Sequence, residues 1–182
     1  MKNDRYHIFK ITATAVMIAL TCVLTLAVRI PTPSKGYLNL GDCAVLLSGW
    51  LLGPVWGPVA GGVGSALADL FAGYPVYIPG TLIIKAAMAL IVALLPYPFG
   101  RKHPGVGVIA ASVLAEAFMT AGYWLYEAVV IGEGFAAFAG VSGNVFQGVA
   151  GAAGSCFLIG VLSHTDLGRA YGAGVLAKSR AK

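Results

Sequence analysis

Long apolar runs alternate with short polar or proline-containing breaks along the whole chain. The runs predict six helices, which cover residues 9–29, 42–52, 55–72, 81–95, 106–130 and 139–163. Pro31 and Pro33 end the first run, and a glycine–proline turn at residues 53–58 separates the second run from the third. Because a helix needs about 20 apolar residues to cross a membrane, the pattern predicts an all-α integral membrane protein, a six-transmembrane-helix bundle that forms a single domain over residues 1–182.

Composition supports the membrane assignment. Of the 182 residues, 58% are hydrophobic and 10% are charged, whereas a soluble domain carries roughly 25% charged residues. The N-terminus resembles a signal peptide, with a basic start and an apolar run. However, the uncharged run at residues 11–28 is long enough to span, and no convincing small-residue cleavage site follows it. We therefore expect a retained first helix.

The basic residues predict the orientation of the bundle. All of the twelve Lys and Arg residues except Arg29, Lys35 and Lys85 fall at the N-terminus, in the loop at residues 96–104, or in the tail at residues 164–182. Cytoplasmic segments carry this excess of positive charge, so both termini and the tail are predicted to be cytoplasmic. We expect a multi-pass protein of a prokaryotic plasma membrane. A nucleic-acid partner is not expected, because the basic residues form no aromatic-interleaved patch.

Several charged residues interrupt segments that are otherwise apolar. Lys85 lies one turn into a predicted helix, and we expect it to pair with Asp69 or Glu116, because an unpaired ammonium at this depth is costly. Direct contact between Lys85 and a ligand is the alternative. Asp42 follows an outer loop at residues 32–40, where it either caps the next helix or belongs to a loop that closes over a site.

A polar stripe follows the fifth predicted helix. Glu116, Thr120, Tyr123 and Glu127 are spaced by four, three and four residues, which places them on one helical face, and Trp124 lies beside them. Such a face is expected to line the bundle interior or a cavity rather than contact lipid. In the sixth helix, Asn144 and Gln147 lie one turn apart in the predicted outer half.

Catalytic patterns are absent from the sequence. His7, His103 and His164 all fall on predicted cytoplasmic flanks, so no histidine–carboxylate metal site is expected in the membrane. The sequence contains neither a nucleophile elbow nor a phosphate-binding loop of P-loop spacing. We therefore expect a protein that is not an enzyme, holds no metal or cofactor, and does not itself power transport with ATP through that route.

The remaining polar residues suggest a binding site. Amide, carboxylate and aromatic groups together suit a small, flat, hydrogen-bonding molecule. No arginine cluster is present, so a multiply phosphorylated ligand is not expected. Polar side chains also hold membrane helices together, which is the competing interpretation for each candidate. The candidates are Asn39, Asp42, Lys85, Glu116, Thr120, Tyr123, Trp124, Glu127, Asn144 and Gln147.

Four sequence motifs resemble those of a known family. Residues 37–42 read YLNLGD, residues 52–54 read LGP, residues 60–69 read AGGVGSALAD and residues 81–85 read TLIIK. With six helices in about 180 residues, the chain resembles the substrate-binding S components of energy-coupling factor (ECF) vitamin transporters over nearly its whole length. Ala15 and Ala19 resemble the AxxxA motif of such subunits. Within the riboflavin-type branch, carriers of hydroxymethylpyrimidine and pyridoxine look most similar.

The resemblance implies a function that composition and spacing do not supply. Such a subunit captures a vitamin or vitamin precursor from outside, with the outer loop as a gate and with ligand contacts from that loop and helices four to six. Ala15 and Ala19 would then dock onto a coupling membrane subunit, which works with two ATPase subunits. Hydroxymethylpyrimidine or pyridoxine is favoured as the ligand, and riboflavin or another B-vitamin remains open.

Two other functions compete with this one. An autonomous secondary carrier or channel for a small polar solute would use Glu116 and Lys85 to relay protons and would need no ATPases. A structural or assembly protein of the membrane would bind no small ligand at all.

Overall fold

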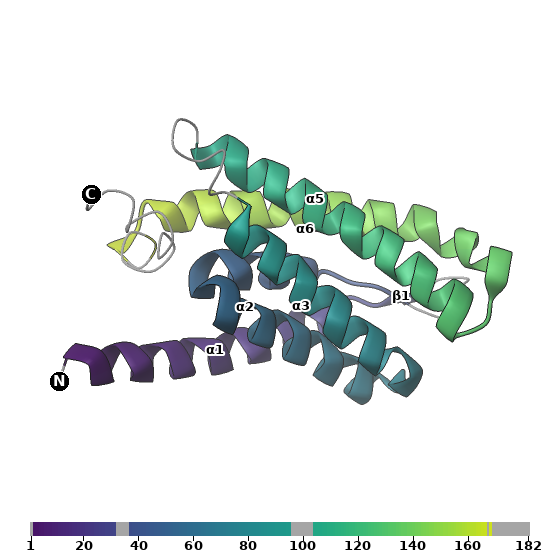
Figure 1. The fold of residues 1–182 in the computed structure, drawn as a ribbon, viewed down its shortest axis with the longest axis horizontal. Helices are drawn as coiled ribbons and strands as arrows, with labels where there is room; N and C mark the ends of the chain where they lie inside the picture. The colour runs from purple at the N-terminus through teal and green to yellow at the C-terminus, as the bar shows by residue number, and fades with distance from the viewer. Residues whose placement is uncertain (1, 32–36, 96–103, 167, 169–182) are drawn as a thin grey trace.

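The computed structural model describes residues 2–31, 37–95, 104–166 and 168 of the chain. The described residues form an elongated bundle (Figure 1). Its main helices are α1 (Lys2–Ala27), α2 (Asp42–Ala72), α3 (Ile78–Leu94), α5 (Pro104–Leu125) and α6 (Phe138–Ser163). Within the described residues, 5 helices are long and apolar enough to cross a membrane. The predicted inner loop with Arg101 and Lys102, and the basic tail beyond residue 168, lie outside the described residues.

Helix α2 reverses direction at Gly53. This residue has φ 81° and ψ −170°, which is not helical. The Ser48 hydroxyl donates to the Gly57 carbonyl at 3.1 Å, although nine residues of straight helix would separate these positions by about 13 Å. The limbs on either side of Gly53 therefore run back alongside each other.

The reversal explains the difference between the predicted and observed helix counts. The prediction of six helices counts the limb at residues 42–52 and the limb that follows Gly53 separately. The first limb is about 16 Å long at 1.5 Å per residue, roughly half the thickness of a hydrocarbon core. It joins its successor within a single 31-residue element, α2.

Other boundaries also differ from the prediction. Helix α1 begins at Lys2 rather than near residue 9, and α5 continues into a π-helical turn, η2 (Tyr126–Val130). Short 3₁₀ turns, η1 (Pro75–Tyr77) and η3 (Gly134–Ala137), precede α3 and α6. Strand β1 (Ile30–Pro31), just before the predicted outer loop, pairs antiparallel with β2 (Tyr37–Leu38) within it. Strands of two residues give no periodic signal, so the sequence did not predict them.

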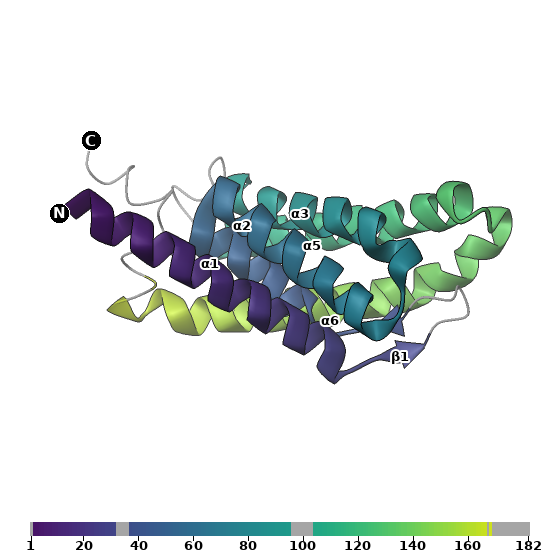
Figure 2. The same ribbon diagram turned by 90° about the horizontal axis from the view of Figure 1, so that it is seen from below.

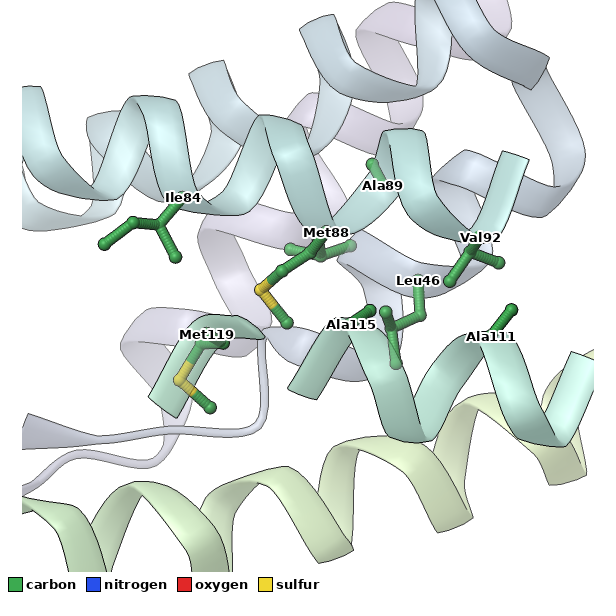
Figure 3. Packing of buried hydrophobic residues seen from close by; sticks show 9 residues of the cluster. Leu46, Ile84, Met88, Ala89, Val92, Ala111, Ala115 and Met119 are labelled. Carbon is green, nitrogen blue, oxygen red and sulfur yellow. The ribbon is translucent and has the colours of Figure 1, made fainter. Parts of the chain in front are cut away.

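Helix α2 packs against α1, α3 and α6. Glycines permit these close approaches: a Cβ atom at Gly64 would lie 2.7 Å from the Ile18 carbonyl oxygen of α1, and one at Gly62 would lie 2.8 Å from the Leu82 carbonyl oxygen of α3. A core cluster that includes Leu46, Met88 and Met119 joins α2, α3 and α5 (Figure 3). This packing fixes the helices that carry the polar residues described below.

Two views show how the ends of the bundle are arranged. The start of α1 and the end of α6 lie at the same end, while β1 lies toward the other (Figures 1 and 2). Large apolar side chains such as Ile83 (68% exposed) and Phe146 (71% exposed) face outward, as expected where lipid is the solvent. The cytoplasmic location of both termini stays a prediction.

Candidate ligand-binding site

A small polar cavity lies beneath the segment that contains β2. Its volume is about 30 Å³, which accommodates on the order of one or two water molecules. Residues from the β2 segment and from α2, α3, α5, α6 and the turns beside them converge on it. The lining residues are Tyr37, Asn39, Asp69, Tyr77, Thr81, Tyr123, Glu127, Asn144 and Gln147.

Two long-range hydrogen bonds hold the β2 segment over this cavity. The Tyr37 hydroxyl donates to Asp69 Oδ1 at 2.7 Å, and the Asn39 backbone N–H donates to Gln147 Oε1 at 2.8 Å. The Asn39 side chain makes a local contact within the same segment, in which its Oδ1 accepts a hydrogen bond from the Gly41 N–H at 2.9 Å. Burial and the neighbouring Asp69 carboxyl group raise the pKa of the Tyr37 hydroxyl above its usual value, so Tyr37 remains a donor at neutral pH.

Three tyrosines, Tyr37, Tyr77 and Tyr123, line the cavity. The ring centroids of Tyr77 and Tyr123 are 6.5 Å apart, and the Tyr37 ring lies 4.9 Å from that of Tyr74, which is not a lining residue. The Tyr77 hydroxyl donates to Glu127 Oε1 at 3.2 Å. Flat faces beside buried hydrogen-bonding groups are the combination that orients small ring compounds in binding pockets.

A buried ion pair lies next to the cavity. Lys85 Nζ pairs with Asp42 Oδ1, and Gln147 Nε2 donates to Asp42 Oδ2 at 2.7 Å. The expectation that Lys85 pairs with Asp69 or Glu116 was therefore wrong. Asp69 is bonded by Tyr37 instead, while the first turn of α2 places Asp42 against α3, within reach of Lys85.

Asp42 is not a helix cap. Gly41 occupies the N-cap position of α2 and makes no side-chain cap bond. Asp42 lies in the first turn with its side chain fully buried. The helix dipole still favours the charged form of Asp42, because the residue lies at the start of the helix. Its observed partners are Lys85, in an ion pair, and Gln147, in a hydrogen bond.

The predicted stripe on the fifth helix divides between two cavities. Tyr123 and Glu127 line the polar cavity, whereas Glu116, Thr120 and Trp124 line an apolar groove of about 470 Å³ between α5 and α6. Helix α5 packs against both α3 and α6, and residues of α6 contribute to both cavities. Helical spacing predicted a single shared face, but it did not reveal that the residues on this face line two different cavities.

Glu116 is buried at the inner side of this groove. It is 5% exposed, and neither carboxyl oxygen has a hydrogen-bond partner among the described residues. A Cβ atom at Gly151 would collide with both the Glu116 carboxyl group and Asp42, so the two acidic side chains converge on this glycine. The Thr120 hydroxyl donates to the Glu116 carbonyl of its own helix at 3.0 Å.

Four lining residues were not among the predicted site residues, namely Tyr37, Asp69, Tyr77 and Thr81. Asp69 carried a usable signal, because an ionisable residue within a membrane-spanning segment is a functional candidate by default. The others gave none, since their roles depend on how the turns beside α2 and α3 fold. Within the described residues, no group of three or more His, Cys, Asp or Glu side chains is placed to hold a metal ion.

Comparisons with known proteins agree with the resemblance seen in the sequence. The chain is 40% identical over 131 residues to a Pyrococcus woesei protein described as an uncharacterized protein in a gap 3′ region, an alignment that covers 71% of this chain and 84% of that protein. A family model described as "ECF-type riboflavin transporter, S component" matches residues 5–164. That match includes every residue that lines the polar cavity. Because it covers most of the chain, the protein belongs to the family of ECF-type riboflavin transporter S components, which are membrane transport proteins and not enzymes.

Proposed function

We propose that the protein is the substrate-capture subunit of an ATP-driven ECF importer and that it binds a small heterocyclic vitamin or vitamin precursor from outside the cell. Membership of the S-component family implies vitamin transport through the ECF system. The polar cavity beneath the β2 segment carries the more specific proposal, because it gathers hydrogen-bonding and aromatic groups from distant parts of the chain.

The size of the cavity favours a small ligand. At about 30 Å³, it must enlarge even for a single six-membered ring, since ligand pockets usually have volumes of about 300–1,000 Å³. A pyrimidine or pyridine requires a smaller enlargement than the three fused rings of a flavin. We therefore favour hydroxymethylpyrimidine or pyridoxine over riboflavin, with other B-vitamins as further candidates.

Enlargement requires the β2 segment to move. The Tyr37 and Asn39 contacts are the long-range hydrogen bonds that hold it to α2 and α6. Each contributes on the order of 1 kcal/mol, so a ligand that supplies replacement contacts can offset their loss. This segment therefore acts as the gate of the proposed site.

The proposed docking surface lies on α1, away from the cavity. Ala15 and Ala19 are both exposed on this helix, and no described residue of α1 lines the cavity. Small residues at this spacing allow a partner helix to approach closely. The proposed partners are a coupling membrane subunit and two ATPase subunits, and the bilayer surrounds the bundle.

Ligand identity is tested with the purified protein. Native mass spectrometry first identifies any small molecule that co-purifies, and calorimetric titration then compares hydroxymethylpyrimidine, pyridoxine and riboflavin without ATP. We expect 1:1 binding that is tightest for one of the first two. Asn144→Ala should weaken binding by about 5- to 150-fold, the equivalent of one lost buried contact. Ser142→Ala, at an exposed position of the same helix, is the matched control.

The transport result separates this proposal from an autonomous carrier. Uptake into proteoliposomes should require the coupling subunit, both ATPases and ATP. Uptake by the protein alone, driven by a proton gradient, would replace the proposal with the carrier. A protein that binds none of the B-vitamins would refute the substrate-capture function.

A further inference from the structure

The interior around the polar cavity carries an excess of negative charge. Asp69 and Glu127 line the cavity, and Asp42 and Glu116 are also buried in the bundle. Among the described residues of α2, α3, α5 and α6, Lys85 is the only basic side chain. Its charge is already matched by Asp42. Asp69 therefore lines the cavity without a basic side chain from these helices as its partner.

Asp69 is the carboxyl group best placed to accept a hydrogen bond from a ligand. It is 5% exposed and lines the cavity. Its Oδ1 accepts from the Tyr37 hydroxyl at 2.7 Å, while Oδ2 has no hydrogen-bond partner among the described residues. A buried carboxylate oxygen without a donor is costly, and a ligand that supplies one removes this cost.

The tyrosines beside Asp69 favour the same kind of ligand. Tyr37, Tyr77 and Tyr123 all line the cavity, and the Tyr123 ring already has an ammonium group 5.4 Å from its centroid, that of Lys85. Aromatic faces attract cations and stack on flat rings. A flat ring with a donor or positive charge at its edge therefore complements both the carboxyl group and the rings.

We propose that the site selects a nitrogen heterocycle with an exocyclic amino group or a protonated ring nitrogen, which donates to Asp69 and sets the specificity. The inference rests on the function proposed above and narrows its substrate class. An aminopyrimidine meets the requirement directly, and a pyridine meets it when its nitrogen is protonated. Phosphate esters and carboxylates of the same rings are excluded, because their negative charge would be placed among buried carboxyl groups.

The test compares two ligands of nearly the same shape. Calorimetric titration of the wild-type protein uses 4-amino-5-hydroxymethyl-2-methylpyrimidine and its 4-oxo counterpart, in which the amino donor is replaced by a carbonyl acceptor. We expect the amino compound to bind about 10- to 100-fold more tightly, the range for a hydrogen bond to a charged group. The phosphate ester of the amino compound should show no measurable binding.

A matched pair of variants assigns the preference to one residue. Asp69→Asn removes the charge and provides an amide donor, so the preference for the amino compound should disappear or reverse. Glu133→Gln removes one negative charge near the same end of the bundle, and Glu133 does not line the cavity. This control should retain the wild-type preference.

Each outcome decides the inference. Equal affinity of the wild-type protein for the amino and oxo compounds would overturn it, as would an unchanged preference in Asp69→Asn. Both results leave vitamin capture intact, because they still show binding. Failure of the wild-type protein to bind any B-vitamin would instead refute the proposed function. The comparison of ligands on the wild-type protein remains decisive if Asp69→Asn does not fold.

Discussion

Gln147 on α6 donates from Nε2 to Asp42 Oδ2 at 2.7 Å, although the two residues are 105 positions apart in the chain. The oxygen of the same amide accepts from the Asn39 N–H at 2.8 Å. One side chain therefore connects the segment over the cavity with the ion pair beside it. A ligand that competes for Gln147 would disturb both contacts together.

Replacing Gln147 should weaken both connections. Gln147→Leu keeps a similar volume but leaves the Asn39 N–H and one oxygen of Asp42 without these partners. We expect the free energy of unfolding to fall by about 1–3 kcal/mol, measured by reversible denaturation in detergent. Amide exchange at residues 37–41 should also become faster. Phe146→Leu, at an exposed neighbouring position, should change neither quantity, and wild-type behaviour of Gln147→Leu would contradict the proposed connection.

The buried ion pair predicts a larger effect that a second substitution partly reverses. Lys85→Met leaves Asp42 buried without its counter-charge, which should cost about 3–5 kcal/mol of unfolding free energy. Lys85→Met combined with Asp42→Asn removes both charges and should recover part of that loss. Thermal unfolding of the two variants in detergent measures the difference. A double variant less stable than Lys85→Met would show that Asp42 has other important partners.

Lys85 also shows where prediction from the sequence reached its limit. Its position in an apolar helix correctly required a partner, because unpaired charge is costly there. The choice among Asp42, Asp69 and Glu116 depended on how α2 folds back toward α3, which hydrophobic periodicity does not encode. The same holds for the stripe on α5, where helical spacing predicted a shared face but not its division between two cavities.

Local chemistry was easier to predict than these tertiary contacts. The glycine–proline pair at residues 53–54 predicted a break, and the chain does reverse at Gly53. The apolar runs predicted the long helices, since their length and composition suffice for membrane spans. The β1–β2 ladder and the Tyr37–Asp69 bond depend on segments far apart in the chain, so no local pattern predicted them.

The backbone at Gly53 gives a prediction about stability. Its φ of 81° and ψ of −170° lie in a region that essentially only glycine adopts. Gly53→Ala should therefore lower the free energy of unfolding by about 1–3 kcal/mol, although no atom lies within 4 Å of the added Cβ. Gly105→Ala in α5 also has no atom within 4 Å and keeps an ordinary φ, so it should be neutral or slightly stabilising. Equal effects in the two variants would contradict an origin in backbone strain.

The hydrogen bond from Tyr37 to Asp69 predicts a particular pH dependence. Folding raises the pKa of Tyr37, so the unfolded chain loses this proton first, near the usual tyrosine value of about pH 10. The contribution of Tyr37 to stability is therefore complete below about pH 9 and decreases as the pH rises above 10. Tyr37→Phe should be less stable than the wild type by about 1–3 kcal/mol at neutral pH, and this difference should shrink above pH 10. A difference that stays constant to pH 11 would show that folding does not raise the pKa of Tyr37.

The exposed alanines of α1 give the prediction that separates binding from transport. Ala15 and Ala19 lie on a face that no described helix covers, and α1 contributes no described residue to the cavity. The double variant Ala15→Trp with Ala19→Trp should therefore keep its vitamin affinity within about twofold of the wild type. Its uptake with the coupling subunit and ATPases should fall to background, because two large rings prevent the close approach of a partner helix. Val16→Trp adds a ring at a neighbouring position that is 59% exposed and should retain uptake. Full uptake by the double variant would exclude this face as the docking surface, and loss of uptake in Val16→Trp as well would mean that the contact does not depend on the small residues.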